Sequence, residues 1–173
     1  MAMIKNAACF KSDFPSKITK LPLKWAGGKR WLVPHLSILW ERHKHRRLVE
    51  PLCGDLAVAL GLMPEKALLN DINRHVINFY QWLQKGLIAE IAMENDQDLY
   101  YKHRDEFNSL IANDIADTKR TVELFYYLNR TGYNGLCRFN RKGGFNVPFG
   151  RYSCIKICVI SLNIVILLLA GNF

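Results

Sequence analysis

The residues best suited to chemistry gather in one short stretch, residues 128–151. All of its charged side chains are basic, namely Arg130, Arg138, Arg141, Lys142 and Arg151. Amide and aromatic side chains lie among them, namely Asn134, Asn140, Asn146, Tyr133 and Phe139. Arginine can bond guanine through two hydrogen bonds, asparagine can bond adenine edges or phosphates, and flat rings can stack on bases. The stretch indicates contact with DNA, and the alternative is a solvated basic hairpin with structural aromatics.

The same stretch predicts the element that presents these side chains. Two short runs of apolar and polar residues, 136–140 and 145–149, flank the sequence Arg-Lys-Gly-Gly at 141–144. A Gly-Gly pair tolerates the positive φ angles of tight turns, so we predict a β-hairpin. Pro148 then belongs on an edge strand or at a bulge, because it has no N–H to donate. A two-stranded ribbon fits the major groove of B-DNA.

A second group of candidate residues forms the sequence Trp-Ala-Gly-Gly-Lys at 25–29. The pattern that follows predicts a loop opening a helix, and the free N–H groups at a helix start attract anions. The functional interpretation is a site for a cofactor carboxylate, with Lys29 as the counter-charge and Trp25 as a stacking wall. The alternative is an ordinary turn before a surface helix.

Residues 48–72 predict a βαβ unit. A buried strand is expected from Leu48, followed by a turn at Gly54 and a helix, and a second strand over 67–72 that ends in Asp71. In nucleotide-binding α/β folds an acid at this offset bonds the ribose hydroxyls. The alternative is a generic βαβ unit with a surface acid. Farther along, helices are expected over 74–86 and 118–128, with mixed helix and loop over 87–113.

Composition agrees with a basic DNA-binding protein without proving one. The 173 residues carry a net charge of +9, with a pI of about 9.4, although ribosome-like or membrane-surface binding gives similar numbers. None of the five cysteines forms a C-x-x-C pair or has histidine at zinc-finger spacing, so we expect reduced thiols, no metal site and a cytoplasmic location. No apolar run follows the first lysine, and we expect no signal peptide.

The stretch 128–151 resembles the DNA-reading hairpin of the DNA adenine methyltransferase family, bacterial and phage enzymes that methylate adenine N6, typically in GATC. The resemblance implies that Leu136 and Arg138 read the outer base pairs, with Pro148 close by. It implies that Tyr133 inserts beside the target adenine. It also implies phosphate contacts from Asn140, Asn146 and Arg151, while Asn134 is a candidate for DNA contact because of its amide group. The partner would be double-stranded DNA, bound by a monomer.

The resemblance extends to the cofactor, which would be S-adenosylmethionine. Its implied contacts are Trp25, Ala26, Gly27, Lys29, Pro51, Gly54 and Asp71, and Lys24 would reach the DNA. One position departs from the family, because Leu56 stands where a second glycine is usual. A bulky side chain there would crowd the methionine end of the cofactor.

The fold class expected from this resemblance is α/β, an incomplete Rossmann-like methyltransferase core with a helical plus β-hairpin target-recognition insertion. Residues 20–73 would be the N-terminal part of the cofactor-binding core and 74–152 the recognition region. Residues 153–173 form an apolar tail that departs from the family, which favours a frameshift or premature stop over a membrane anchor. A role in mismatch repair, restriction-modification or phage biology stays open.

The sequence offers no candidate catalytic residue. The family acts through an Asp-Pro-Pro-Tyr motif, but no two of the six prolines are adjacent. We therefore expect a truncated adenine methyltransferase that is inactive alone. The alternatives are a catalytically silent DNA-binding remnant and a membrane-tethered basic protein.

Overall fold

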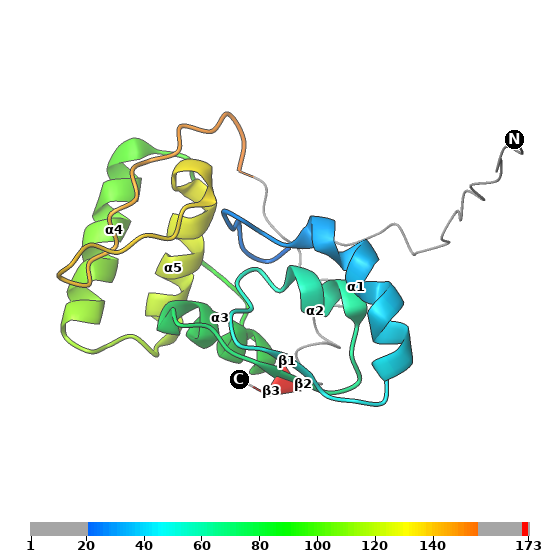
Figure 1. Cartoon of the computed structure of the whole chain (residues 1–173). Helices are drawn as coiled ribbons and strands as arrows, with labels where there is room; N and C mark the ends of the chain where they lie inside the picture. The colour runs from blue at the N-terminus through cyan, green and yellow to red at the C-terminus, as the bar shows by residue number, and fades with distance from the viewer. Residues whose placement is uncertain (1–20, 156–170, 173) are drawn as a thin grey trace, which may run out of the picture.

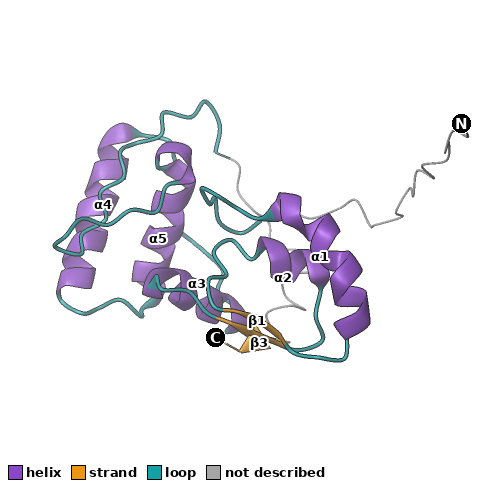
Figure 2. Ribbon diagram, viewed as in Figure 1, coloured by secondary structure: helices purple, strands orange, loops and turns teal. Residues whose placement is uncertain are grey.

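The computed structural model describes residues 21–155 and 171–172. In chain order its elements are η1 (Arg30–Leu32), α1 (Val33–Trp40), η2 (Glu41–His43), β1 (Leu48–Glu50), α2 (Ala57–Leu62), β2 (Ala67–Leu69), α3 (Arg74–Gln84), α4 (Gln97–Ala112), α5 (Lys119–Thr131), η3 (Tyr133–Gly135) and β3 (Gly171–Asn172). A small sheet with α1, α2 and α3 around it forms one end of the molecule (Figure 1). The pair α4 and α5, with the hairpin across it, forms the other end (Figure 2).

The sheet is parallel, in the order β1-β2-β3. Leu48 lies opposite Ala67 and Glu50 opposite Leu69, so β1, α2 and β2 form the predicted βαβ unit. The prediction of a buried first strand is wrong at Val49, whose side chain is 55% exposed. Among the described residues β1 is an edge strand, so one of its sides lacks a neighbour.

The second strand is shorter than predicted, because it ends at Leu69 rather than at Asp71. The Asp71 carboxylate accepts hydrogen bonds from the backbone N–H groups of Gly54 and Asn73, at 3.0 and 2.9 Å. Asp71 therefore links the loop after β1 to the segment that leads into α3. Backbone pairing continues one residue past β2, since the Asn70 N–H donates to the Glu50 carbonyl at 2.8 Å.

Helix α3 confirms the predicted helix and its predicted stop. Asn73 caps its start by accepting a hydrogen bond from the His75 N–H at 3.0 Å. At its end Gly86 takes a φ of +84°, and the Leu87 N–H donates to the Trp82 carbonyl at 2.9 Å. This is the left-handed helix ending that glycine favours.

Helices α4 and α5 form an antiparallel pair (Figure 1). Asp96 caps α4 and Thr118 caps α5, each accepting from the N–H three residues ahead. The expectation of mixed helix and loop over 87–113 is confirmed, with loop at 87–96 followed by α4, which runs unbroken for 16 residues. Helix α5 lies at the centre of the molecule, and every residue from Thr121 to Thr131 is buried.

One hydrophobic core connects the sheet to the hairpin. It includes Leu56 and Leu69 near the sheet, Phe125 on α5, and Phe145 and Val147 on the hairpin. The expected apolar tail, residues 153–173, falls mostly outside the described residues, apart from 153–155 and the two residues of β3. Within the described part of the chain, no helix is long and apolar enough to cross a membrane.

Candidate functional site

The predicted hairpin is present, although it is held by single bridges rather than by regular strands. Phe139 bridges Phe145, and Gly132 bridges Phe149, both antiparallel. Pro148 lies at an irregular position between the two bridges, where its carbonyl accepts the Tyr133 N–H at 2.9 Å. This position needs no N–H from proline, as expected from its chemistry.

The hairpin turn is organised by Asn140. Its Oδ1 accepts from the backbone N–H groups of Lys142 at 2.9 Å and Gly144 at 3.0 Å. Gly143 takes a φ of +80°, which confirms the turn chemistry of the Gly-Gly pair. The Asn140 oxygen therefore serves the turn, and a phosphate contact from this residue, which stays a prediction, would use its amide N–H groups.

Alternation along the hairpin separates a buried face from an exposed face. Phe139 and Phe145 point inward, and the Phe139 ring stacks on His75 with centroids 5.1 Å apart. Arg138 and Pro148 are exposed on the opposite face. Arg138 Nε donates to Asn146 Oδ1 at 2.9 Å, and Arg138 Nη2 donates to the Asn146 carbonyl at 3.2 Å. The exposed face thus presents a guanidinium group in a fixed orientation.

The base of the hairpin is fastened to the segment before Trp25. The buried Asn129 side chain exchanges two hydrogen bonds with the Lys24 backbone, both at 2.8 Å. Lys24 Nζ donates to the Arg130 carbonyl at 2.7 Å and lies 3.5 Å from the centre of the Tyr152 ring. Gly135 must lack a side chain here, since a Cβ would lie 2.6 Å from the Lys24 Cβ.

Tyr152 extends this connection to the residues that enter the hairpin. Its hydroxyl donates to the Gly132 carbonyl at 2.9 Å and accepts the Asn134 N–H at 2.9 Å. Asn134 itself has a φ of +51°, and Tyr133 beside it is 49% exposed. Sequence reasoning missed both Asn129 and Tyr152. The contact between positions 24 and 129 has no local signal, because 105 residues separate them.

The predicted cofactor residues Trp25 and Gly54 lie together. Gly54 has a φ of +50°, and a Cβ there would lie 2.8 Å from the Trp25 Nε1, so the indole packs directly on the glycine. Gly28 approaches Asp55 in the same way, with its Cβ position 2.7 Å from Oδ2. Lys29 Nζ donates to the Gly27 carbonyl at 2.6 Å, so the loop folds back on itself.

Asp71 joins this group from the end of β2. Its Oδ2 accepts from the Gly54 N–H, and the Tyr80 hydroxyl donates to the Gly54 carbonyl at 2.7 Å. Pro51 is exposed in the same β1–α2 loop, and Ala26 and Gly27 are exposed beside Trp25 in the chain. The fold therefore gathers Trp25, Gly54 and Asp71 at the carboxyl edge of the sheet, where parallel α/β folds bind ligands.

Leu56 adopts the backbone conformation that glycine favours. Its φ is +62° and its side chain is fully buried in the hydrophobic core. A left-handed conformation costs a residue with a side chain on the order of 1 kcal/mol or more. The Leu56 side chain points into the core, so replacing the usual glycine with leucine strains the backbone and adds to core packing.

Acidic groups concentrate at this edge of the sheet. Glu50 Oε1 is buried without a hydrogen-bond partner in the described part of the chain. Burial, opposed by a backbone hydrogen bond at Ala59 and aided by the Asp55 charge, raises the pKa of Glu50 from 4.5 to about 7. Burial also raises the pKa of Asp55, although Arg30 and Lys29 counteract it. Buried carboxyl oxygens of this kind accept hydrogen bonds from hydroxyl or ammonium groups.

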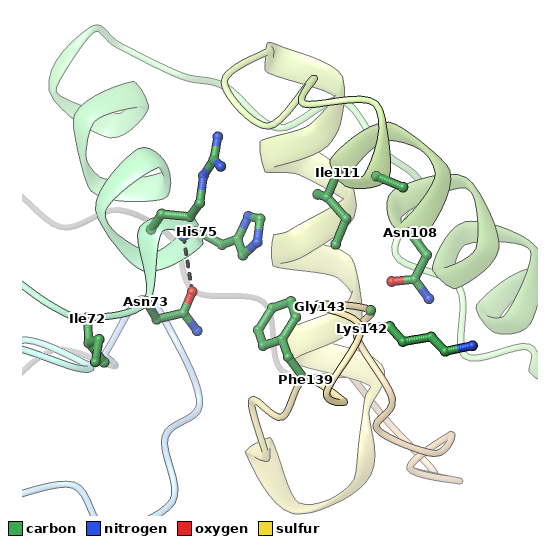
Figure 3. Close-up of a pocket in the computed structure, with 11 residues that line it drawn as sticks. Ile72, Asn73, His75, Asn108, Ile111, Phe139, Lys142 and Gly143 are labelled. Carbon is green, nitrogen blue, oxygen red and sulfur yellow. Dashed lines mark hydrogen bonds between the residues drawn. The ribbon is translucent and has the colours of Figure 1, made fainter.

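A cavity of about 550 Å³ lies between α3, α4 and the hairpin turn (Figure 3). Ile111, Phe139, Lys142 and the buried His75 are among its lining residues. Burial, and then the Arg74 charge, lower the pKa of His75 from 6.5 to about 4, so its ring is neutral at pH 7. Phe139 and Lys142 were candidates for DNA contact from the sequence, whereas none of the expected cofactor residues lines this cavity. Across the described ranges, no cluster of three or more His, Cys, Asp or Glu side chains fits a metal ion.

Residues 25–158 match the model of the family described as D12 class N6 adenine-specific DNA methyltransferase. The match covers most of the chain, including the Trp25–Lys29 loop, the βαβ unit and the hairpin. The chain therefore belongs to this family of DNA-modifying enzymes. The resemblance drawn from the hairpin and the loop is confirmed.

Curated relatives agree with this assignment. The chain is 41% identical over 140 residues to a DNA adenine methylase of Escherichia coli (strain K12), and the match covers 75% of the chain and 47% of that protein. A DNA adenine methylase of Vibrio cholerae is 43% identical, with the same shares. The type II methyltransferase M1.LlaDCHI of Lactococcus lactis is 35% identical over 149 residues, covering 82% of the chain and 52% of that protein. The chain spans about half the length of these relatives.

Proposed function

We propose that the chain carries the cofactor-binding and DNA-recognition parts of an S-adenosylmethionine-dependent adenine N6-methyltransferase that acts at GATC. The observation that carries this proposal is the connection between the two sites. Asn129 and Lys24 hold the segment leading into Trp25 against the end of α5, where the hairpin begins. A base recognised by the hairpin would therefore lie next to the loop that binds the cofactor.

The residues at the carboxyl edge of the sheet fit S-adenosylmethionine. Trp25 offers a flat wall, and Asp71 keeps acceptor capacity on both oxygens beyond its bonds to Gly54 and Asn73. Lys29 carries the positive charge that a carboxylate needs, and Glu50 holds a buried oxygen that accepts no hydrogen bond from the residues that the structure describes. When bound, the cofactor supplies a methyl group on a positively charged sulfur. Ala26, Gly27 and Pro51 would complete the rim of this site.

The hairpin supplies the DNA contacts in this proposal. Arg138, Leu136 and Pro148 would read base edges, and the exposed Tyr133 would enter the stack beside the target adenine. Lys24, Asn134, Asn140, Asn146 and Arg151 would fix the hairpin on the duplex. Phosphate contacts position a protein on DNA and base contacts specify the sequence.

Methyl transfer to an exocyclic amine needs groups that accept hydrogen bonds from its N–H groups, and that relieve it of a proton, once the base has left the stack. In the family an Asp-Pro-Pro-Tyr motif does this, and these 173 residues contain no adjacent prolines. Asp71 is committed to the backbone of Gly54 and Asn73 and to the proposed ribose contact. We therefore propose that a polypeptide of these residues binds cofactor and DNA without transferring the methyl group, which would make it silent in catalysis.

The test is methyl transfer from labelled S-adenosylmethionine to a GATC duplex, run beside calorimetry of cofactor binding on the same purified polypeptide. We expect cofactor binding without turnover. Turnover that is lost in a Lys29→Ala variant would show that these residues complete the reaction. No cofactor binding would reject the proposed pocket.

A further inference from the structure

Arg138 and Asn146 form a hydrogen-bonded pair on the exposed face of the hairpin. Asn146 contacts Arg138 three times. Its side-chain oxygen accepts from Nε at 2.9 Å, its carbonyl accepts from Nη2 at 3.2 Å, and its N–H donates to the Arg138 carbonyl at 3.0 Å. Asn146 therefore binds the guanidinium of Arg138 through its side chain and its carbonyl, and binds the Arg138 backbone through its N–H.

The two bonds to the guanidinium use a particular edge of this group. A guanidinium has five N–H donors in one plane. The N–H of Nε and one N–H of Nη2 lie side by side, and Asn146 takes both. The second N–H of Nη2 and one N–H of Nη1 point together along the end of the side chain. They form another pair of parallel donors, and the O6 and N7 atoms of guanine are a matching pair of acceptors.

We propose that Asn146 is a positioning residue for Arg138, which holds the guanidinium so that its end-on donor pair faces a guanine edge. This inference rests on the proposed DNA recognition and goes beyond it, since the family resemblance implies only a phosphate contact for Asn146. An arginine side chain that is already oriented loses less conformational entropy when it binds. A fixed donor pair also rejects a base that lacks two acceptors, because its N–H groups are then left unpaired.

The experiment measures dissociation constants by fluorescence anisotropy on a GATC duplex and on a permuted duplex of the same composition. The ratio of the two constants is the sequence preference. We expect Arg138→Ala to reduce the preference by about 5- to 150-fold, which corresponds to the loss of one base-reading pair. Asn146→Ala should reduce it by about threefold or more, and the double variant should lose no more than Arg138→Ala alone.

A phosphate contact from Asn146 predicts a different pattern. Asn146→Ala would then weaken both duplexes equally, leave the preference unchanged and add to the effect of Arg138→Ala. That result would overturn the positioning role while the proposed base reading by Arg138 stands. An unmutated chain without any preference for GATC would instead reject the base reading itself, and the positioning role with it.

Asn146→Asp separates positioning from loss of the hairpin fold. Aspartate keeps an oxygen acceptor for Arg138 Nε, so the preference should be retained, while its negative charge weakens both duplexes together. Loss of the preference in this variant would count against the positioning role. Asn113→Ala is the matched control, since Asn113 is an exposed asparagine at the end of α4 and should leave both constants unchanged.

Discussion

Glu50→Gln should stabilise the protein at neutral and basic pH. The unfolded chain releases the Glu50 proton near pH 4.5, whereas the folded chain keeps it up to about pH 7. Between these values the unfolded state binds fewer protons, so the free energy of unfolding falls as the pH rises. Glutamine has nearly the same shape and no charge, and the variant should lose this dependence.

The magnitude follows from the rise in pKa from 4.5 to about 7. At about 1.4 kcal/mol for each pKa unit, the charged carboxyl would cost the folded state at most about 3.4 kcal/mol. Glu50 is only partly buried, so solvent screens part of this cost. We expect the variant to be about 1–2 kcal/mol more stable at about pH 8 and nearly unchanged at about pH 4, below the pKa of the unfolded chain.

The assay is urea unfolding followed by tryptophan fluorescence across this pH range. His75, whose pKa is lowered to about 4, titrates in the same range with the opposite sign. The quantity to compare is therefore the difference between the variant and the unmutated protein at each pH. Glu65→Gln, on an exposed loop, is the control and should show no difference. Parallel stability profiles for Glu50→Gln and the unmutated protein would refute the buried charge at this position.

Three further changes test other parts of the molecule. Leu56→Gly relieves the left-handed conformation but removes a fully buried side chain, and the second effect should dominate, lowering the free energy of unfolding in urea by about 2–4 kcal/mol. Asp71→Asn keeps one acceptor for the loop and should weaken S-adenosylmethionine binding in calorimetry without changing duplex affinity. Arg151→Ala should weaken all duplexes alike and lower the slope of log affinity against log salt by about 0.9, measured by anisotropy. Unchanged cofactor affinity in Asp71→Asn would contradict the ribose contact of Asp71. An unchanged salt slope in Arg151→Ala would contradict its phosphate contact.

Local chemistry explains which parts of the fold were predictable. The Gly-Gly turn, the Gly86 helix stop and the placement of Asp71 after the second strand each depend on residues close in sequence or on a regular βαβ unit. Gly54 and Asp71 were both expected at the cofactor, and they lie together because the carboxyl ends of parallel strands share one edge. The bounds of α4 were left open within the predicted mixture of helix and loop over 87–113, although its Asp96 cap was a readable signal of where the helix begins.

Contacts between distant segments could not be predicted in this way. The hydrogen bonds between the Asn129 side chain and the Lys24 backbone depend on how α5 packs against the segment before Trp25. The stacking of His75 on Phe139 depends on how α3 packs against the hairpin. The cavity in Figure 3 arises from the same packing. Such contacts require tertiary arrangement, which neither periodicity nor motif spacing encodes.

Sequence-dependent DNA binding by the unmutated chain is the most direct test of the central claim, that this chain contains the DNA-reading part of an adenine methyltransferase. Anisotropy titrations on the GATC and permuted duplexes should give tighter binding to GATC by at least about tenfold, with affinity that falls steeply as salt rises. Equal affinity for the two duplexes at every salt concentration would contradict the claim.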